Sequence, residues 1–161
     1  MDKISLEVVT PSGRALESTA DEVIAPGARG EFTVLPGHLP LLISLRAGIL
    51  SFRSGGELHK SAIGDGFAEV SPEKVLILTD NFKDREGIDP VLVRQELNHV
   101  QTELQKSDIE PSEKKALIAK ESWLAAQLDL YGGEATPAIM RPGEDWDAET
   151  DEQPLDQVES T

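Results

Sequence analysis

The first half of the chain alternates apolar and polar positions over short runs. Ile4, Leu6 and Val8 are two residues apart, a spacing typical of a strand that buries one face. Later apolar runs end at the turn-forming pairs Pro26-Gly27 and Pro36-Gly37. Many short strands at such close spacing predict a β-sandwich or a flattened barrel.

Two segments in this half carry the signature of a β-hairpin. Ser54-Gly55-Gly56-Glu57 separates two apolar-rich runs, and its glycines can supply the positive φ angles that a tight turn needs. Ser71-Pro72-Glu73-Lys74 separates another two such runs. We therefore expect about ten short strands within residues 1–83.

After residue 83 the apolar period becomes that of a helix. Asp89 followed by Pro90 predicts a helix start, because an N-cap carboxylate accepts backbone N–H groups and proline fits the first helical position. The apolar stripe of this helix steps by 4, 3 and 4 residues and consists of Val93, Leu97, Val100 and Leu104.

A second helix is predicted to begin at Pro111 and to end at a cap formed by Gly132-Gly133. Because the connection between the helices is short, they should form an antiparallel hairpin over residues 84–133. Each stripe is narrow, which suits packing on the partner helix and on one other surface. The second stripe comprises Leu117, Leu124, Leu128 and Tyr131, supported by Ala116 and Trp123.

Residues 134–161 lose this periodicity. They hold nine acidic residues and one basic residue, a net charge of −8 out of −15 for the chain. We interpret them as a disordered, solvated tail. The predicted fold class is therefore α+β, with a β-sandwich domain at 1–83, a helical hairpin at 84–133 and an acidic disordered tail at 134–161.

Composition narrows the possible functions. The chain has no cysteine, which excludes disulfides and thiolate metal sites. Its net charge of −15 argues against binding to nucleic acid. No apolar run approaches the roughly 20 residues that span a bilayer, so we expect no direct membrane insertion. The first residues lack the basic and apolar segments of a signal peptide, and we expect the bacterial cytoplasm as the compartment.

No constellation of residues predicts catalysis, a metal site or a cofactor. The three histidines lack the spacing of metal ligands; we interpret His59 and His99 as surface residues, and His38, at a constrained turn, as a candidate contact residue. Asp21 and Glu22 should point to opposite faces of a strand, so they would not act on one bond. We therefore expect a protein that is not an enzyme and binds no cofactor.

Residues 25–42 are unusual because three prolines and three glycines are interleaved with charged and apolar side chains. A segment held rigid in this way can present a docking surface to another protein. An ordinary loop whose strand ends lie in the core explains the same composition about as well.

Four segments, in the same order and spacing, resemble the epsilon subunit of F-type ATP synthases of the bacterial type. The resemblance covers about the first 80 residues, and the helical hairpin fits the family by pattern alone. It implies a β-sandwich of about ten strands followed by two helices. The segments are L-E-V-V-T-P-S-G at 6–13, A-D-E-V-I-A-P-G at 20–27, G-E-F-T-V-L-P-G-H-L-P-L-L at 30–42 and G-F-A-E-V at 66–70.

The resemblance also implies a role. The chain would be a non-catalytic rotor subunit of the central stalk, at the cytoplasmic face of the bacterial inner membrane. It would link the gamma subunit to the c-ring, so that proton translocation is coupled to ATP synthesis. The implied c-ring contacts are Arg29, Gly30, Glu31 and Phe32. The implied gamma contacts are His38, Leu39, Pro40, Leu41 and Leu42.

In this family the hairpin can extend toward the alpha and beta subunits and inhibit ATP hydrolysis. Some members bind ATP through an I/L-D-x-x-R-A motif. Here Ile88 and Asp89 are present, but Leu92 and Val93 stand where arginine and alanine are expected. We therefore predict no nucleotide site. The alternative function is a free-standing β-sandwich interaction module unrelated to the synthase.

Overall fold

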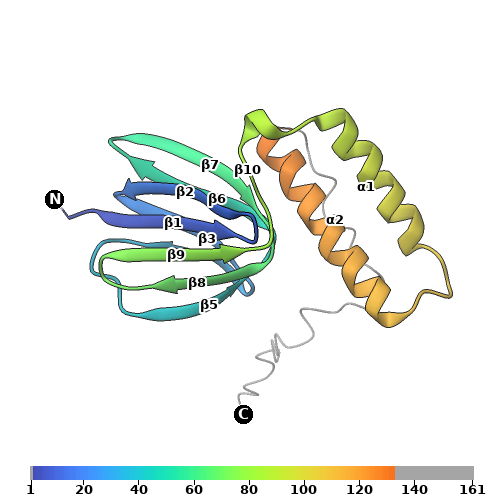
Figure 1. Cartoon of the computed structure of the whole chain (residues 1–161), viewed down its shortest axis with the longest axis horizontal. Coiled ribbons are helices and arrows are strands. Elements are labelled where there is room, and N and C mark those ends of the chain that lie inside the picture. Colours follow the sequence, from blue (N-terminus) through green and yellow to red (C-terminus); the bar gives the residue numbers. More distant parts are fainter. Residues whose placement is uncertain (1, 133–161) are drawn as a thin grey trace, which may run out of the picture.

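The computed structural model describes residues 2–132 and places ten strands in that range ahead of a short 3-10 helix and two α-helices (Figure 1). The predicted tail at 134–161 lies outside the described residues. The elements are β1 Ile4–Thr10, β2 Gly13–Ala20, β3 Glu22–Gly27, β4 Gly30–Val34, β5 Leu41–Leu45, β6 Gly48–Ser54, β7 Glu57–Ile63, β8 Gly66–Val70, β9 Lys74–Thr79, β10 Phe82–Lys83, η1 Arg85–Gly87, α1 Pro90–Leu104 and α2 Pro111–Tyr131.

The strands form one curled sheet in the order β10-β7-β6-β3-β5-β8-β9-β1-β2, with β4 paired to β3. Strand β3 joins the two layers, because Glu22, Val23 and Ile24 pair with β6 while Gly27 pairs with β5. The pair β1 and β9 is parallel, and the other pairs are antiparallel. The predicted β-sandwich of about ten strands is confirmed.

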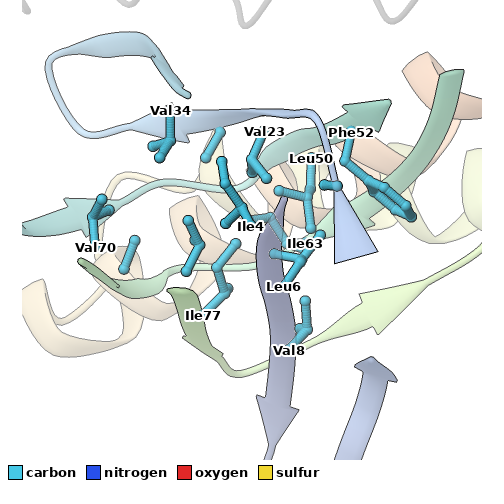
Figure 2. Packing of buried hydrophobic residues seen from close by; sticks show 14 of the residues in the cluster. Ile4, Leu6, Val8, Val23, Val34, Leu50, Phe52, Ile63, Val70 and Ile77 are labelled. Carbon is cyan, nitrogen blue, oxygen red and sulfur yellow. The ribbon is translucent and has the colours of Figure 1, made fainter. Parts of the chain in front are cut away.

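The core lies between the two layers and is built almost entirely from aliphatic side chains (Figure 2). The alternation expected in β1 is present, since Ile4, Leu6 and Val8 are fully buried. Phe52 is the aromatic residue among the buried side chains of this cluster in residues 2–132. A chain with 4% aromatic residues therefore fills its core with Val, Ile, Leu and Ala.

Both predicted hairpins are confirmed. Strands β6 and β7 pair in register from Gly48 and Ile63 to Ser54 and Glu57, and strands β8 and β9 pair in the same way. The two-residue turn between β6 and β7 has φ angles of 59° and 86°. Positive φ at both turn positions explains the Gly-Gly pair of the sequence.

Both helices begin at the predicted prolines, Pro90 and Pro111, and α2 ends at the predicted glycine. The Asp89 side chain caps α1, and Gly132 ends α2 in the left-handed conformation with φ 95°. The predicted Gly133 lies outside the described residues. Val93, Leu97 and Val100 pack against Leu124 and Leu128, with partly buried Leu104 and Leu117 beside them, to form a second apolar cluster. The helices thus lie side by side as a hairpin (Figure 1).

The hairpin rests on the sandwich through α2, which contacts β6 and β7 (Figure 1). Two predictions about α2 were wrong. Ala116 is exposed, and Tyr131 is more than one-third exposed and stacks with Arg85 instead of joining the stripe. The buried residues Ala126 and Gln127 were missed, because they lie away from the stripe that packs on α1.

Candidate functional site

The β3–β4 hairpin presents Arg29 at its tip. Gly27 pairs with Gly30, so Ala28 and Arg29 alone connect the strands. A Cβ at position 27 would lie 2.5 Å from the carbonyl oxygen of Gly30, and Gly30 itself has φ 131°. Two positions that require glycine fix the backbone of the tip, while the Arg29 side chain is exposed.

The next two residues divide between solvent and core. Glu31 is exposed, whereas Phe32 is half-buried and packs against the sandwich core. Within residues 2–132, Arg29 and Glu31 form no ion pair. The structure thus brings the predicted c-ring contacts, Arg29 to Phe32, together on one rigid tip with two exposed charges.

The loop after β4 is tied to the sandwich by backbone hydrogen bonds. The Gly37 N–H donates to the carbonyl of Pro72 at 2.8 Å, and the His38 N–H donates to that of Leu35 at 3.1 Å. The His38 ring nitrogen Nδ1 lies 2.7 Å from the Leu39 carbonyl oxygen. Leu39 itself is 80% exposed and has nothing to cover it within the described chain.

Strand β5 separates the two groups of predicted contacts. At its start, Leu41 pairs with Val70 of β8. At its end, the Ala28 N–H donates to Ser44 O at 2.8 Å, which brings the Arg29 tip alongside. Leu41 and Ser44 are three residues apart, and three steps of about 3.3 Å place these two points roughly 10 Å apart. The two groups lie on one side of the sandwich without forming a single site.

Sequence reasoning missed part of the exposed apolar surface. The missed residues are Phe67, 54% exposed, and Leu78, 48% exposed, which pair directly across β8 and β9 and extend the surface of the predicted contact Leu42, 71% exposed. Buried Ala68 and Val70 alternate with Phe67 along β8, so the signal was present in the period-two pattern. Apolar groups on the outer face of three neighbouring strands, β5, β8 and β9, form a surface suited to a protein partner.

Several carboxylates of the sandwich are used in ion pairs. Asp21 pairs with Lys3, and Glu22 lies 3.5 Å from Arg53, so the two neighbours point to different partners. The Lys3 side chain donates to Asp21 and lowers the pKa of that carboxyl. Within residues 2–132 no group of three or more His, Asp or Glu could hold a metal ion.

A second group of surface ion pairs is centred on Glu7 of β1. Hydrogen bonds from Lys74, and secondarily from Arg14, lower the pKa of Glu7. The Glu7 oxygens lie 3.0 Å from Lys74 Nζ and 3.1 Å from Arg14 Nε. These contacts join β9, β1 and β2 across the outer face, and their arrangement is that of surface ion pairs rather than of a general acid and base.

The segment that was compared with the ATP-binding motif, residues 88–93, forms the start of α1. Asp89 Oδ1 accepts from the N–H groups of Val91 and Leu92 at 3.1 and 3.2 Å. Leu92 is 60% exposed and Val93 is buried. Both side chains are apolar, so neither offers a cation near Asp89. Across the hairpin, Lys120 pairs with Glu96 at 2.6 Å. The residues here support the helix start and the hairpin.

Comparison with known proteins identifies the family. Residues 3–85 match the family model of the ATP synthase delta/epsilon chain β-sandwich domain. The chain is 36% identical over 131 residues to the ATP synthase epsilon chain of Magnetococcus marinus, covering 81% of this chain and 96% of that one. It is 35% identical over 113 residues to ATP synthase epsilon chain 2 of Syntrophotalea carbinolica, covering 70% and 80%.

A solved structure shows the same fold. A chain of the Euglena gracilis mitochondrial ATP synthase OSCP/F1/c-ring assembly superposes with a TM-score of 0.69 at 23% identity, covering 80% of this chain and 81% of that one. The structural similarity thus extends past the β-sandwich into the helical hairpin. The chain belongs to the family of F-type ATP synthase epsilon chains, which excludes the alternative of an unrelated interaction module.

Proposed function

We propose that this chain links the gamma subunit to the c-ring and so couples proton translocation to ATP synthesis. The observation that carries the proposal is the pair of rigid, exposed contact groups at the two ends of β5. A subunit that transmits torque needs a stiff body with separate contacts for its two neighbours. The curled sheet provides that body, because β3 ties its two layers together.

The Arg29 tip is the proposed contact with the c-ring. Arg29 and Glu31 present opposite charges side by side, and half-buried Phe32 anchors them to the core. Paired charges at the rim of an interface fix register and partner choice more than they add affinity. This matches a contact that must hold one orientation while the rotor turns.

The proposed gamma contact runs from His38 to Leu42. Leu39 and Leu42 carry most of the exposed apolar area, and Phe67 and Leu78 extend it along the sheet. Such a patch gains free energy when a partner covers it, at about 25 cal/mol per Å² of apolar surface. Hydrogen bonds at Gly37 hold the loop in place, so little ordering is required on binding.

The chain would act without a catalytic group of its own, as a peripheral subunit at the cytoplasmic face of the bacterial inner membrane. None of the helices within residues 2–132 is long and apolar enough to cross a bilayer. The exposed charges at the proposed contacts would serve in docking, whereas Asp21, Glu22 and Glu7 are held in ion pairs. We propose no cofactor and no nucleic-acid partner for this role.

The helical hairpin is the proposed regulatory part. It would inhibit ATP hydrolysis when extended toward the alpha and beta subunits. Lys114, Lys115 and Lys120 lie on α2 and would face the partner in that state. Removal of residues 84–161 should then raise hydrolysis by the assembled enzyme, and unchanged hydrolysis would end the inhibitory role while leaving the coupling role untouched.

Co-purification and a charge reversal test the main proposal. The chain should form a near-equimolar complex with the gamma subunit, and failure of two folded partners to associate would refute it. Glu31→Lys should weaken attachment to the c-ring with little change in thermal stability. Glu57→Lys is the matched control, because Glu57 is also exposed but lies at the start of β7, away from the Arg29 tip. Equal effects of the two substitutions would contradict the proposed contact.

A further inference from the structure

The curled sheet does not close on itself, and the gap lies between β2 and β7. Within residues 2–132, β2 pairs with β1 alone, and β10 pairs with β7 only at Ala62 and Ile63. The first part of β7, from Glu57 to Ser61, therefore has a neighbouring strand on one side only, which is β6. We call this stretch the open edge of β7, and such an edge can accept a further extended segment.

The register of the β6–β7 hairpin determines which backbone groups face the gap. Ser54 and Glu57 flank a two-residue turn and therefore exchange two hydrogen bonds, and bonded pairs recur at every second residue. The N–H and C=O groups of Leu58 and Lys60 consequently point away from β6. Within the described chain they form no other backbone hydrogen bond, whereas Ala62, the next in the series, is paired with β10. The open edge thus offers free donors and acceptors.

The gap is also a groove that can hold side chains. Leu16 of β2, Phe52 of β6 and Leu58 of β7 supply its apolar walls, and Leu58 is 45% exposed. The ring of His59 stacks on that of Phe52 at 4.9 Å between centroids and also lines the groove. Charged groups of both signs, from β7 and the 84–86 segment, surround these walls. An extended segment with short apolar side chains fits such a groove.

The described chain ends beside this groove. Arg85 lines it and donates through Nη2 to the Tyr131 carbonyl at 3.2 Å, at the end of α2 (Figure 1). The preceding residue, Asp84, accepts from Ser61 Oγ at 2.7 Å. Residues 133–161 therefore start near the Ser61 end of the open edge. A segment that follows the edge from there would run antiparallel to β7, the orientation in which strand pairing is the more stable.

The sequence beyond α2 contains a segment suited to this edge. Ala138-Ile139-Met140 is the longest apolar run within 133–161, and it lies between Pro137 and Pro142. Proline favours extended backbone in the residue before it, as a strand requires. Five residues separate the run from Gly132 and can span up to about 17 Å, whereas the edge from Ser61 to Leu58 is only about 10 Å long. The run can thus reach the whole open edge.

We propose that residues 138–141 of this chain dock in the groove and add an antiparallel strand to the open edge of β7. A short tether gives a segment a millimolar effective concentration, so an intrinsic Kd of about 0.1 mM would fill the groove about ten times out of eleven. A second copy has no such tether. Its approach is opposed by a net charge of −15 on each chain and by Lys60, since a lysine on an exposed edge disfavours pairing between molecules. The proposal does not depend on binding to gamma or to the c-ring.

Hydrogen exchange of backbone amides in the full chain, followed by NMR, tests the proposal. The Lys60 N–H should be protected, because it would donate to the docked segment. Ile139→Pro removes a backbone donor from that segment and should speed Lys60 exchange about tenfold, equivalent to about 1.4 kcal/mol. The His59 N–H is the internal reference, because it points toward β6 and should exchange at the same rate in both proteins.

Ala148→Pro is the matched control, because it places a proline elsewhere in residues 133–161 and should leave Lys60 exchange as in the unaltered chain. The proposal is overturned if Ile139→Pro exchanges at Lys60 no faster than Ala148→Pro. It is also overturned if protection of Lys60 rises with protein concentration, since a second copy would then be the occupant. A parallel change at His59 would overturn it as well, because the substitution would then act on the stability of the hairpin.

Discussion

Leu42→Ala should weaken gamma binding while leaving the fold intact. Full burial of a leucine side chain contributes about 1.5–3 kcal/mol relative to exposure. Leu42 is 71% exposed in the free chain, so about seven-tenths of that gain, roughly 1–2 kcal/mol, remains available to a partner. The dissociation constant should therefore rise by about 5- to 30-fold, since 1.4 kcal/mol is tenfold.

Titration calorimetry of purified gamma with each variant measures this change directly. Leu92→Ala is the matched control, because Leu92 is 60% exposed on α1, away from the proposed surface. Both substitutions should alter the free energy of unfolding by less than about 0.5 kcal/mol, as expected at exposed positions. Equal affinity of the two variants for gamma would refute the assignment of Leu42 to the contact.

Three further predictions concern stability, measured by urea denaturation. Gly66→Ala should cost about 3 kcal/mol or more, because a Cβ there would lie 1.9 Å from the Leu78 carbonyl oxygen, whereas Gly87→Ala meets nothing within 4 Å and should be nearly neutral. Asp89→Ala should cost about 1 kcal/mol through loss of the α1 cap, and no loss would mean that the cap is dispensable. The hydrogen bond from Lys74 lowers the pKa of Glu7 from its ordinary value of 4.5. The ionised Glu7 carboxylate therefore stabilises the fold above pH 4.5, and this stabilisation is lost as the pH falls through the folded-state pKa. Glu7→Gln should flatten the pH dependence of stability in that acid range, and an unchanged profile would contradict this.

Local chemistry explains why most of the fold could be predicted. The period of two in β1, the Gly-Gly turn after β6 and the Asp89-Pro90 helix start each depend on neighbours in the sequence. The order of the strands in the curled sheet could not be predicted from such local patterns. The parallel pairing of β1 with β9 joins residues about 70 positions apart, and no local pattern specifies it.

The candidate contacts were found from composition and resemblance, but their arrangement required the structure. Arg29 and Leu42 are thirteen positions apart in one segment, 25–42, that reads as a single unit. The register of β3, β4 and β5 places them at opposite ends of a strand. Phe67 was missed as a surface residue because an aromatic side chain in a strand is more often expected to face the core.

Ala126 and Gln127 were missed for one physical reason, which is that α2 packs on two bodies. A stripe chosen by period alone finds the face toward α1, where Leu124 and Leu128 lie. At 100° per residue, Ala126 lies about 160° from Leu124 around the helix, and Gln127 lies between the two faces. Burial on both faces weakens the amphipathic pattern, so sequence periodicity cannot identify the second partner.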